Sequence, residues 1–398
     1  MNDMSKKLRT VKTIKAGKNF TCIGSECPLT CCKGWTVTLD KKTFNLYRNH
    51  DEFSKHISKK VGNETRNSKT FGTIKLKEDG NCPLQDEVGL CNVQKELGAS
   101  ALSKTCSTFP RLISVFPDNV YQGFTMGCPE AARLLINQPD STDIVDAEND
   151  HSNLPRFDGS SLRRMPQSNL MVWQAVYRFV QMANDDLWAR MTAIHVFFKT
   201  MEQLTIRSEQ DVLVHLDRLS GALSAKGLDS DPAIFQVETL APEMLSHVTF
   251  SNDQRSLAVA QQRAIAALDY ATPGFNTHVK NFIIARDIWW KRFSQRHPQV
   301  FRNLLLNEIF SKAAVFGGSV DGVVNLLLDA SIWLAYIRFM LIANAKYFGD
   351  DYTADEAALM VSQITRRINH NRKVSQQIKD ALVKKFGDAG AAANLLIA

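Results

Sequence analysis

Residues 22–32 read Cys-Ile-Gly-Ser-Glu-Cys-Pro-Leu-Thr-Cys-Cys, and this stretch holds half of the eight cysteines in the chain. The other four are Cys82, Cys91, Cys106 and Cys128, and no cysteine follows Cys128 in a chain of 398 residues. Cysteines confined to the first third of a chain indicate a site that needs several thiols close together. Three kinds of site have this requirement: a metal ion, an iron–sulfur cluster and a disulfide framework.

The spacing of the cysteines helps to separate these alternatives. Within residues 22–32 the cysteines are separated by four, three and zero residues, and no Cys-x2-Cys pair occurs anywhere in the sequence. Structural zinc is commonly held by such pairs, whereas the four irons of an iron–sulfur cluster spread the ligand positions and accept irregular spacing. The spacing favours an iron–sulfur cluster, with zinc as the alternative metal and redox or disulfide chemistry as the third alternative.

Prolines next to the cysteines also favour a metal or a cluster. Cys27, Cys82 and Cys128 each directly precede a proline. Proline ends regular structure and leaves nearby backbone N–H groups free to donate to sulfur. The candidate metal ligands are Cys22, Cys27, Cys31, Cys32, Cys82, Cys91, Cys106 and Cys128.

The sequence indicates a cytoplasmic protein. Its basic start is not followed by an apolar run, as a secretory signal would require. The apolar segment 332–343 is too short for a membrane span and contains Arg338, which favours a buried helix. Disulfides are rare in the reducing cytosol, so metal or redox chemistry is the better explanation for the cysteines.

The composition suits a globular protein that has no nucleic-acid partner. The hydrophobic fraction of 44% is ordinary for a folded chain, and the length allows two or three domains. The net charge of +7 is modest, and the lysines near the N-terminus are better explained as a solvated segment than as a patch for an acidic partner or an anionic lipid surface. Peripheral membrane association through these lysines is the alternative. No nucleic-acid-binding module is recognisable.

Two parts of unlike character follow from the residue patterns. Residues 1–135 predict a small, irregular α+β domain that binds a metal or cluster, with strands near 35–39 and 71–76 and a helix that begins after Asp40. Residues 136–167 are polar and rich in turn residues, which predicts a linker.

From residue 168 onward the apolar residues recur at helical spacing, beginning with Leu170, Trp173, Val176 and Tyr177. We expect residues 168–398 to form an all-α domain with a possible role in substrate recognition, so that the fold is mainly α. After a first helical stretch over about 170–198, further helices are expected near 207–225, 254–270, 276–293, 299–315, 319–347, 353–370 and 373–387. Asp211, Asp253 and Thr353 are expected as caps.

The cysteine-bearing motifs resemble those of a known family. The matching segments are 20–27, 30–35, 80–84, 90–95, 97–98, 102–111 and 128–130. They resemble bacterial flagellin lysine N-methylases, which belong to a broader family of cysteine-rich proteins described as zinc- or iron-chelating. The match covers roughly residues 20 to 135, and the length and the helical second half also fit.

The resemblance implies a function as well as a fold. It implies transfer of a methyl group from S-adenosylmethionine to the ε-amino groups of surface lysines on flagellin, in the cytosol before export. It also implies a [4Fe–4S] cluster held by some of the cysteines. The Cys-x3-Cys-x2-Cys motif of radical S-adenosylmethionine enzymes is interrupted, because Gly34 stands at its third position after Cys27 and Cys31. No Gly-x-Gly-x-x-Gly loop is present.

Lysine methylation requires a neutral amine, although the ordinary lysine pKa is about 10.4. A carboxylate or a tyrosine can act as the base, and aromatic faces can stabilise the sulfonium cation of the donor. Tyr121, Phe124, Glu130 and Trp35 lie near cysteines in the sequence, but packing in the core or around a cluster is the favoured interpretation for each. The sequence assigns neither a catalytic residue nor a methyl-donor pocket.

The choice of cluster ligands also stays open at the level of the sequence. Cys82, Cys91, Cys106 and Cys128 are one set, and a mixture that includes Cys31 and Cys32 is the other. Two functions of another class remain as alternatives. One is a non-enzymatic metal- or cluster-binding module that carries electrons or handles metal, and the other is an interaction protein stapled by its cysteine domain.

Overall fold

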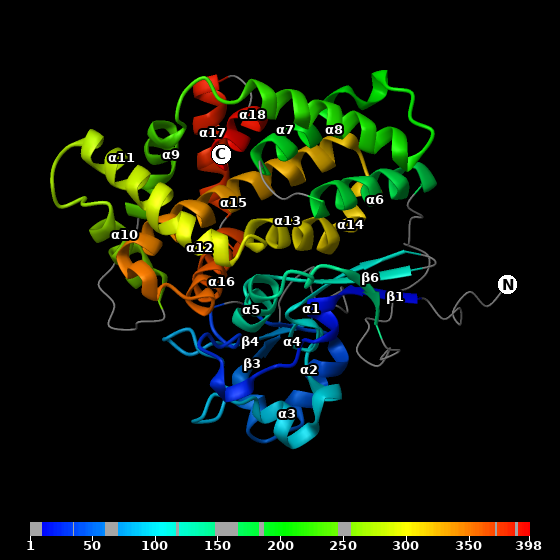
Figure 1. Ribbon diagram of the computed structural model, residues 1–398. Coiled ribbons are helices and arrows are strands. Elements are labelled where there is room, and N and C mark those ends of the chain that lie inside the picture. The colour runs from blue at the N-terminus through cyan, green and yellow to red at the C-terminus, as the bar shows by residue number, and fades with distance from the viewer. Residues whose placement is uncertain are drawn as a thin grey trace. The chain divides into compact units, whose positions relative to one another are not determined.

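The long apolar segment that begins at Val320 forms α15 (Val320–Phe348), the central helix of the larger part of the chain (Figure 1). Its middle, from Ala330 to Ile337, is buried at every position, as expected for a helix that is apolar on all sides. Of the residues that the structure describes, only the segment Val320–Asp351 is long and apolar enough to cross a membrane, and 83% of its apolar window is buried inside the protein. Burial of this extent is the property of a core helix.

The computed structural model describes residues 10–34, 36–59, 71–116, 119–147, 166–182, 187–245, 256–370, 372–386 and 389–398. Two compact units divide the chain. The helical unit comprises Met1–Phe20, Ile113–Asp146 and Gly159–Ala398, and the cysteine unit comprises Thr21–Leu112 and Ala147–Asp158.

In the helical unit, α15 is the central helix of a set that comes mostly from the second half of the chain (Figure 1). The other helices of this unit are α5 (Pro129–Asn137), α6 (Gln167–Gln181), α7 (Leu187–Thr200), α8 (Glu209–Lys226), α9 (Ala233–Leu245), α10 (Leu257–Ala267), α11 (Phe275–Ile284), α12 (Lys291–Arg296), α13 (Val300–Ser311), α14 (Ala313–Phe316), α16 (Ala354–His370), α17 (Arg372–Phe386) and α18 (Ala389–Leu395). Of these, α7, α9, α10, α11, α13, α14, α16, α17 and α18 pack against α15. A π-helical turn, Ala285–Trp290, joins α11 to α12. The prediction of a mainly helical second half is confirmed.

A four-stranded sheet also belongs to the helical unit. Its order is β5 (Arg111–Val115), β6 (Asn119–Phe124), β1 (Thr10–Ile14) and β7 (Ile144–Asp146). β1 runs parallel to β6 and antiparallel to β7, and the short α1 (Lys15–Lys18) follows β1. The sheet approaches α13 closely at Gly123. A Cβ atom at this position would lie 2.8 Å from the Cα of Ser311. The inward face of the sheet is therefore part of the helical core.

The sequence did not predict this sheet, and the unit boundaries differ accordingly. The expected N-terminal domain was 1–135 and the expected linker 136–167, whereas residues 10–20 and 113–146 are part of the helical unit. The physical reason is strand pairing: β1 obtains its hydrogen-bond partners from β6 and β7, which lie over a hundred residues away in the sequence. Of the expected linker, residues 148–165 lie outside the described residues.

The cysteine unit is built around a three-stranded antiparallel sheet in the order β2 (Thr38–Leu39), β4 (Gly72–Ile74) and β3 (Ile57–Lys59). Its helices are short: α2 (Lys41–Arg48), α3 (Asn92–Leu97) and α4 (Lys104–Thr108), with single turns at Gly24–Glu26, Phe53–His56 and Ala99–Ala101. Asp40 caps α2 by accepting from the Thr43 N–H at 2.7 Å, as expected. The small α+β character predicted for this region is confirmed.

Two of the three predicted caps of the helical unit lie at helix starts, and the third lies outside the described residues. Ser208 is the N-cap of α8, and Asp211 reaches back to the Ser208 N–H at 2.9 Å to complete a capping box. Thr353 and Glu356 form the same reciprocal pair at the start of α16. Asp253 lies outside the described residues, and Ser256 caps α10.

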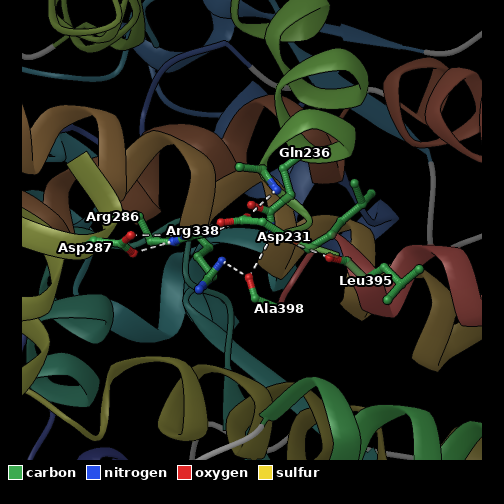
Figure 2. Close-up of polar contacts among 9 residues, drawn as sticks. Asp231, Gln236, Arg286, Asp287, Arg338, Leu395 and Ala398 are labelled. Atoms are coloured by element: carbon green, nitrogen blue, oxygen red, sulfur yellow. Dashed lines mark hydrogen bonds and ion pairs between the residues drawn. The ribbon is translucent and has the colours of Figure 1, made fainter. Parts of the chain in front are cut away.

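Polar side chains hold the end of the chain against α9 and α15 (Figure 2). The side-chain amide of Gln236 donates to the carbonyl oxygen of Ala398 at 2.7 Å and lies 3.3 Å from that of Leu396. The partly buried Arg338 guanidinium donates to the same Ala398 oxygen. Next to this contact, Arg286 of the π-helical turn binds both carboxylate oxygens of Asp231 at 2.7 and 2.8 Å.

Candidate functional site

Five thiols of the cysteine unit lie close enough together to influence one another electrostatically. They are Cys31, Cys32, Cys82, Cys91 and Cys106, which we call the thiol cluster. They come from three segments of the chain that the sequence had identified as separate motifs. The local backbone explains how these segments meet.

The first two segments pair in the manner of antiparallel strands. The Cys82 N–H donates to the Cys32 carbonyl oxygen at 2.8 Å, and the Gly34 N–H donates to the Gly80 carbonyl oxygen at 3.0 Å. Gly80 adopts a positive φ of 79°, which reverses the chain just before Cys82. This pairing places Cys82 beside Cys32 although fifty positions separate them.

The other two thiols stand at the beginnings of short helices. Cys91 precedes the first residue of α3, and the Asn92 N–H that follows it donates to the Leu84 carbonyl oxygen at 2.9 Å. Cys106 lies in the first turn of α4, where its N–H donates to the Ser103 hydroxyl at 3.1 Å. Ser103 is fully buried, so the cap fixes this turn within the unit.

The thiols disfavour one another's ionisation. The hydrogen bond between the Cys31 and Cys32 thiols, together with burial, raises the pKa of Cys32. Burial raises the pKa of Cys82, while the Leu84 N–H that donates to its sulfur opposes the shift. Burial also raises the pKa of Cys106 to about 11, and neighbouring thiols add to each increase. Several thiolates therefore coexist here only if a cation balances their charge.

An apolar floor supports the thiol cluster. Cys82 is part of the core of the cysteine unit, and the partly buried Cys32, Cys91 and Cys106 pack against that core, whereas Cys31 is exposed. Tyr47 is 1% exposed and donates its hydroxyl to the Ala101 carbonyl oxygen at 2.9 Å. Burial and then the neighbouring thiols raise the pKa of Tyr47, so its phenol stays neutral beside them.

The remaining three predicted ligands are Cys22, Cys27 and Cys128. Cys22 is exposed, and the Cys27 thiol donates to the Leu29 carbonyl oxygen at 3.1 Å. Cys128 is buried in the helical unit, directly before α5. Within the described ranges no group of three or more His, Cys, Asp or Glu side chains is arranged to hold a metal ion, so the predicted metal site stays a prediction.

The helical unit contains a cleft of about 570 Å³, which we call the sheet-edge cleft. It lies where β1 and the start of β7 meet α6 and the first turn of α8. Its lining residues are Lys12, Tyr121, Asp143, Ile144, Trp173, Gln174, Tyr177, Arg178, Gln181 and Glu209. Figure 1 shows α6 and α8 side by side, and β1 beside β6.

The polar side chains of the sheet-edge cleft are mostly paired at its rim. Arg178 lies 3.2 Å from a Glu209 carboxylate oxygen, and the Gln181 amide donates to Asp143 at 2.8 Å. Lys12 forms an ion pair with Asp146 at 2.9 Å. The Lys12–Asp146 ion pair is exposed and contributes little to stability, so a ligand can replace it at small cost.

The structure places three of the four aromatic and acidic candidates that the sequence analysis named. Phe124 packs against Phe20 in the core, and Glu130 binds Arg133 through both carboxylate oxygens at 2.7 and 2.8 Å, so the packing interpretation is confirmed for both. Tyr121 packs edge-on against Trp173 and also lines the sheet-edge cleft. Trp35 lies outside the described residues.

Sequence reasoning missed the sheet-edge cleft itself. Trp173 and Tyr177 were used only as markers of helical spacing, and both are at least 97% buried. Their helical spacing gave no sign that part of their surface faces a cleft. The one available signal was Arg178, a charged residue directly beside Tyr177 in an otherwise apolar stretch.

Comparisons with known proteins agree with one another. A family model described as the FliB lysine N-methylase C-terminal domain matches residues 174–395. Lysine-N-methylases of Salmonella typhimurium and Salmonella choleraesuis are each 42% identical to this chain, and each match covers 90% of this chain and 91% of the relative. Flagellar biosynthetic protein FliU of Salmonella muenchen is 40% identical over 144 residues, which are 35% of this chain and 85% of that protein. No solved structure matches.

The family model spans more than half of the chain, and the two full-length relatives span nearly all of it. The matched region of the family model includes most of α6 and the helices that follow it up to α18. The full-length matches extend the similarity to the cysteine unit as well. On this evidence, the chain belongs to the FliB lysine N-methylase family.

Proposed function

We propose that this lysine N-methylase uses S-adenosylmethionine to methylate lysine side chains of flagellin, and that its cysteine unit holds a [4Fe–4S] cluster. The observation that carries the methylase assignment is the similarity over 90% of the chain to two lysine-N-methylases. The flagellar substrate is supported by the similarity to a protein named for flagellar biosynthesis. Action in the cytoplasm, before flagellin is exported, follows from that choice of substrate.

The chemistry of the proposed reaction is a methyl transfer between two named atoms. The neutral lysine nitrogen supplies an electron pair to the methyl carbon, the bond between that carbon and the sulfonium sulfur breaks, and S-adenosylhomocysteine leaves. The nitrogen then gives up a proton to a base or to water. The ordinary lysine pKa of about 10.4 means that the site must remove the proton before attack.

The chemistry of the donors in the cysteine unit supports the proposed cluster. Cys32, Cys82, Cys91 and Cys106 share one apolar floor, and thiols that lie this close together ionise more easily beside a positive charge. The Leu84 N–H, which donates to the Cys82 sulfur, is the kind of contact that stabilises cluster sulfur. We assign these four cysteines as ligands, with Cys31 as the adjacent fifth thiol.

A bound [4Fe–4S] cluster supplies one-electron exchange and a cross-link between chain segments. The protein's own residues do the rest of the work at this site. The paired segments 32–34 and 80–82 orient two of the thiols, and the apolar floor excludes water from their inner side. The short elements of the cysteine unit have little core of their own, so such a cross-link also stabilises the fold.

The test uses full-length protein purified without oxygen. Iron, acid-labile sulfide and zinc are measured per chain, and flagellin is incubated with the protein and S-adenosylmethionine that carries a labelled methyl group. About four irons and four sulfides per chain, with label on flagellin lysines, are expected. Zinc in place of iron overturns the cluster, and an iron-replete sample that leaves flagellin unlabelled overturns the substrate and donor assignment.

A further inference from the structure

The sheet-edge cleft combines two properties that occur together in ligand sites, a suitable volume and an aromatic floor. Its volume of about 570 Å³ lies in the usual range for small-molecule pockets. Tyr121, Trp173 and Tyr177 supply an aromatic floor, and each ring is almost wholly buried by the protein around it. A floor of this kind is rigid, because rings packed on all other sides do not rotate away.

Two polar groups at the sheet-edge cleft have unused hydrogen-bonding capacity. The Tyr121 hydroxyl makes no hydrogen bond with any residue in the described part of the chain. One Glu209 carboxylate oxygen is buried and, although it lies 3.2 Å from Arg178, it accepts no hydrogen bond there. The Glu209 oxygen is buried, and a buried polar atom without a hydrogen bond is costly, so a ligand that donates to it binds more tightly for that reason.

Charges of both signs line the sheet-edge cleft. Lys12 and Arg178 are cationic, Asp143 and Glu209 are anionic, and the amides of Gln174 and Gln181 both donate and accept. A substrate lysine presents only a cation and would need acidic partners alone. A ligand that carries an ammonium, a carboxylate and an aromatic base uses every type of group present.

We propose that the sheet-edge cleft binds the methyl donor S-adenosylmethionine. The inference rests on the proposed function, which names this donor. Glu209 accepts from the donor's ammonium group, Arg178 faces its carboxylate, and the aromatic floor contacts the adenine or the sulfonium. The Tyr121 hydroxyl gains a hydrogen-bond partner from the ligand.

Binding of S-adenosylmethionine and of S-adenosylhomocysteine to the full-length, iron-loaded protein is measured by equilibrium dialysis. The variants are Glu209→Gln and Tyr121→Phe, which preserve side-chain volume. We expect Kd to rise about tenfold for Glu209→Gln because a charge-assisted hydrogen bond is lost. A smaller rise, about threefold, is expected for Tyr121→Phe.

Matched controls lie outside the cleft. Glu202→Gln and Tyr347→Phe remove the same groups from exposed positions that do not line it, and they should leave Kd unchanged. A third variant, Gln174→Trp, fills the cleft from an exposed position on α6 and should abolish binding. This variant keeps the proposal testable if Glu209→Gln or Tyr121→Phe loses stability.

The outcomes separate this inference from the function on which it rests. If the wild-type protein binds the donor and all three cleft variants bind it equally well, the cleft is not the donor site, although the proposed function stands. If the variants raise KM for flagellin and leave donor binding intact, the cleft takes the substrate and the donor assignment is overturned. If the wild-type protein neither binds the donor nor methylates flagellin, both proposals fail.

Discussion

The backbone N–H of Cys82 donates to the carbonyl oxygen of Cys32 at 2.8 Å, which holds two thiols of one cluster on neighbouring segments. The contact is between main-chain atoms, so it persists whichever side chain stands at either position. Removal of one thiol therefore alters ligation without breaking the pairing that organises the site. Because ligation depends on side chains and the pairing depends on main-chain atoms, a single cysteine substitution in this unit tests ligation alone.

Cys82→Ser should abolish the iron bound per chain, because a buried serine hydroxyl is a poor ligand for iron and cannot replace a thiolate. Cys22→Ser is the matched control: Cys22 is exposed and is not one of the five clustered thiols, so we expect it to retain full iron content. Iron and sulfide analysis, with the visible absorbance of the cluster, measures both variants. Equal iron loss in the two variants would show that Cys22 is also a ligand and that the proposed set is wrong.

Gly123→Ala should destabilise the helical unit by about 3 kcal/mol, because a well-packed contact must move apart. The added methyl group would lie 2.0 Å from the Ser311 hydroxyl oxygen and 2.8 Å from the Ser311 Cα. Gly221→Ala introduces the same methyl group into α8 where no atom lies within 4 Å, and should stabilise by about 0.5–1 kcal/mol. Urea denaturation followed by circular dichroism compares them, and similar effects from both would refute the close sheet–helix contact.

Gln236→Leu should loosen the last residues of the chain. The buried amide of Gln236 donates to the Ala398 carbonyl oxygen at 2.7 Å, and leucine keeps the volume but removes the donor. Because Arg338 still donates to the same Ala398 oxygen, the expected cost is that of one lost hydrogen bond, about 1 kcal/mol. Hydrogen exchange in residues 389–398 should become faster, whereas Gln203→Leu at an exposed position should leave it unchanged. Unaltered exchange in Gln236→Leu would mean that the other contacts of α18 suffice.

The helices could be predicted from the sequence because their signals are local. The segment 319–347 was expected to be helical and forms α15 over Val320–Phe348, and the segment 353–370 likewise forms α16. α9 was missed because Pro242 lies inside it, where a proline normally ends a helix. The sheet was missed because β1 pairs with β6 across more than a hundred residues, and no local pattern specifies such a partner.

For the candidate site, too, the sequence predicts what local patterns specify and misses what contacts between distant segments specify. The sequence indicated a gathering of thiols, and five of them do gather in the cysteine unit. Which five depends on the pairing of 32–34 with 80–82, a contact set by the fold rather than by the spacing of cysteines. The sheet-edge cleft needed the fold even more, because Lys12 and Glu209 come to it from opposite halves of the chain.

Asp231→Asn should cost stability at neutral pH but not in acid. Hydrogen bonds from Arg286 lower the pKa of the Asp231 carboxyl, since they favour its charged form. A lowered folded-state pKa adds stability that is fully present above the ordinary carboxyl value of about 3.9 and is lost as pH falls through the folded-state pKa. The pair is half exposed, so the expected difference at pH 7 is only about 1 kcal/mol.

The free energy of unfolding of the wild type and of Asp231→Asn, measured by urea denaturation between pH 3 and pH 7, tests this sign. The two curves should converge as the pH falls below about 4, because the wild-type carboxyl takes up its proton there first in the unfolded state and then, at lower pH, in the folded state. Asp229→Asn, at an exposed position two residues away, should follow the wild type throughout. A difference between wild type and Asp231→Asn that stays constant down to pH 3 would mean that Asp231 acts mainly through its hydrogen bond from the Ala233 N–H at the start of α9, and not through its charge.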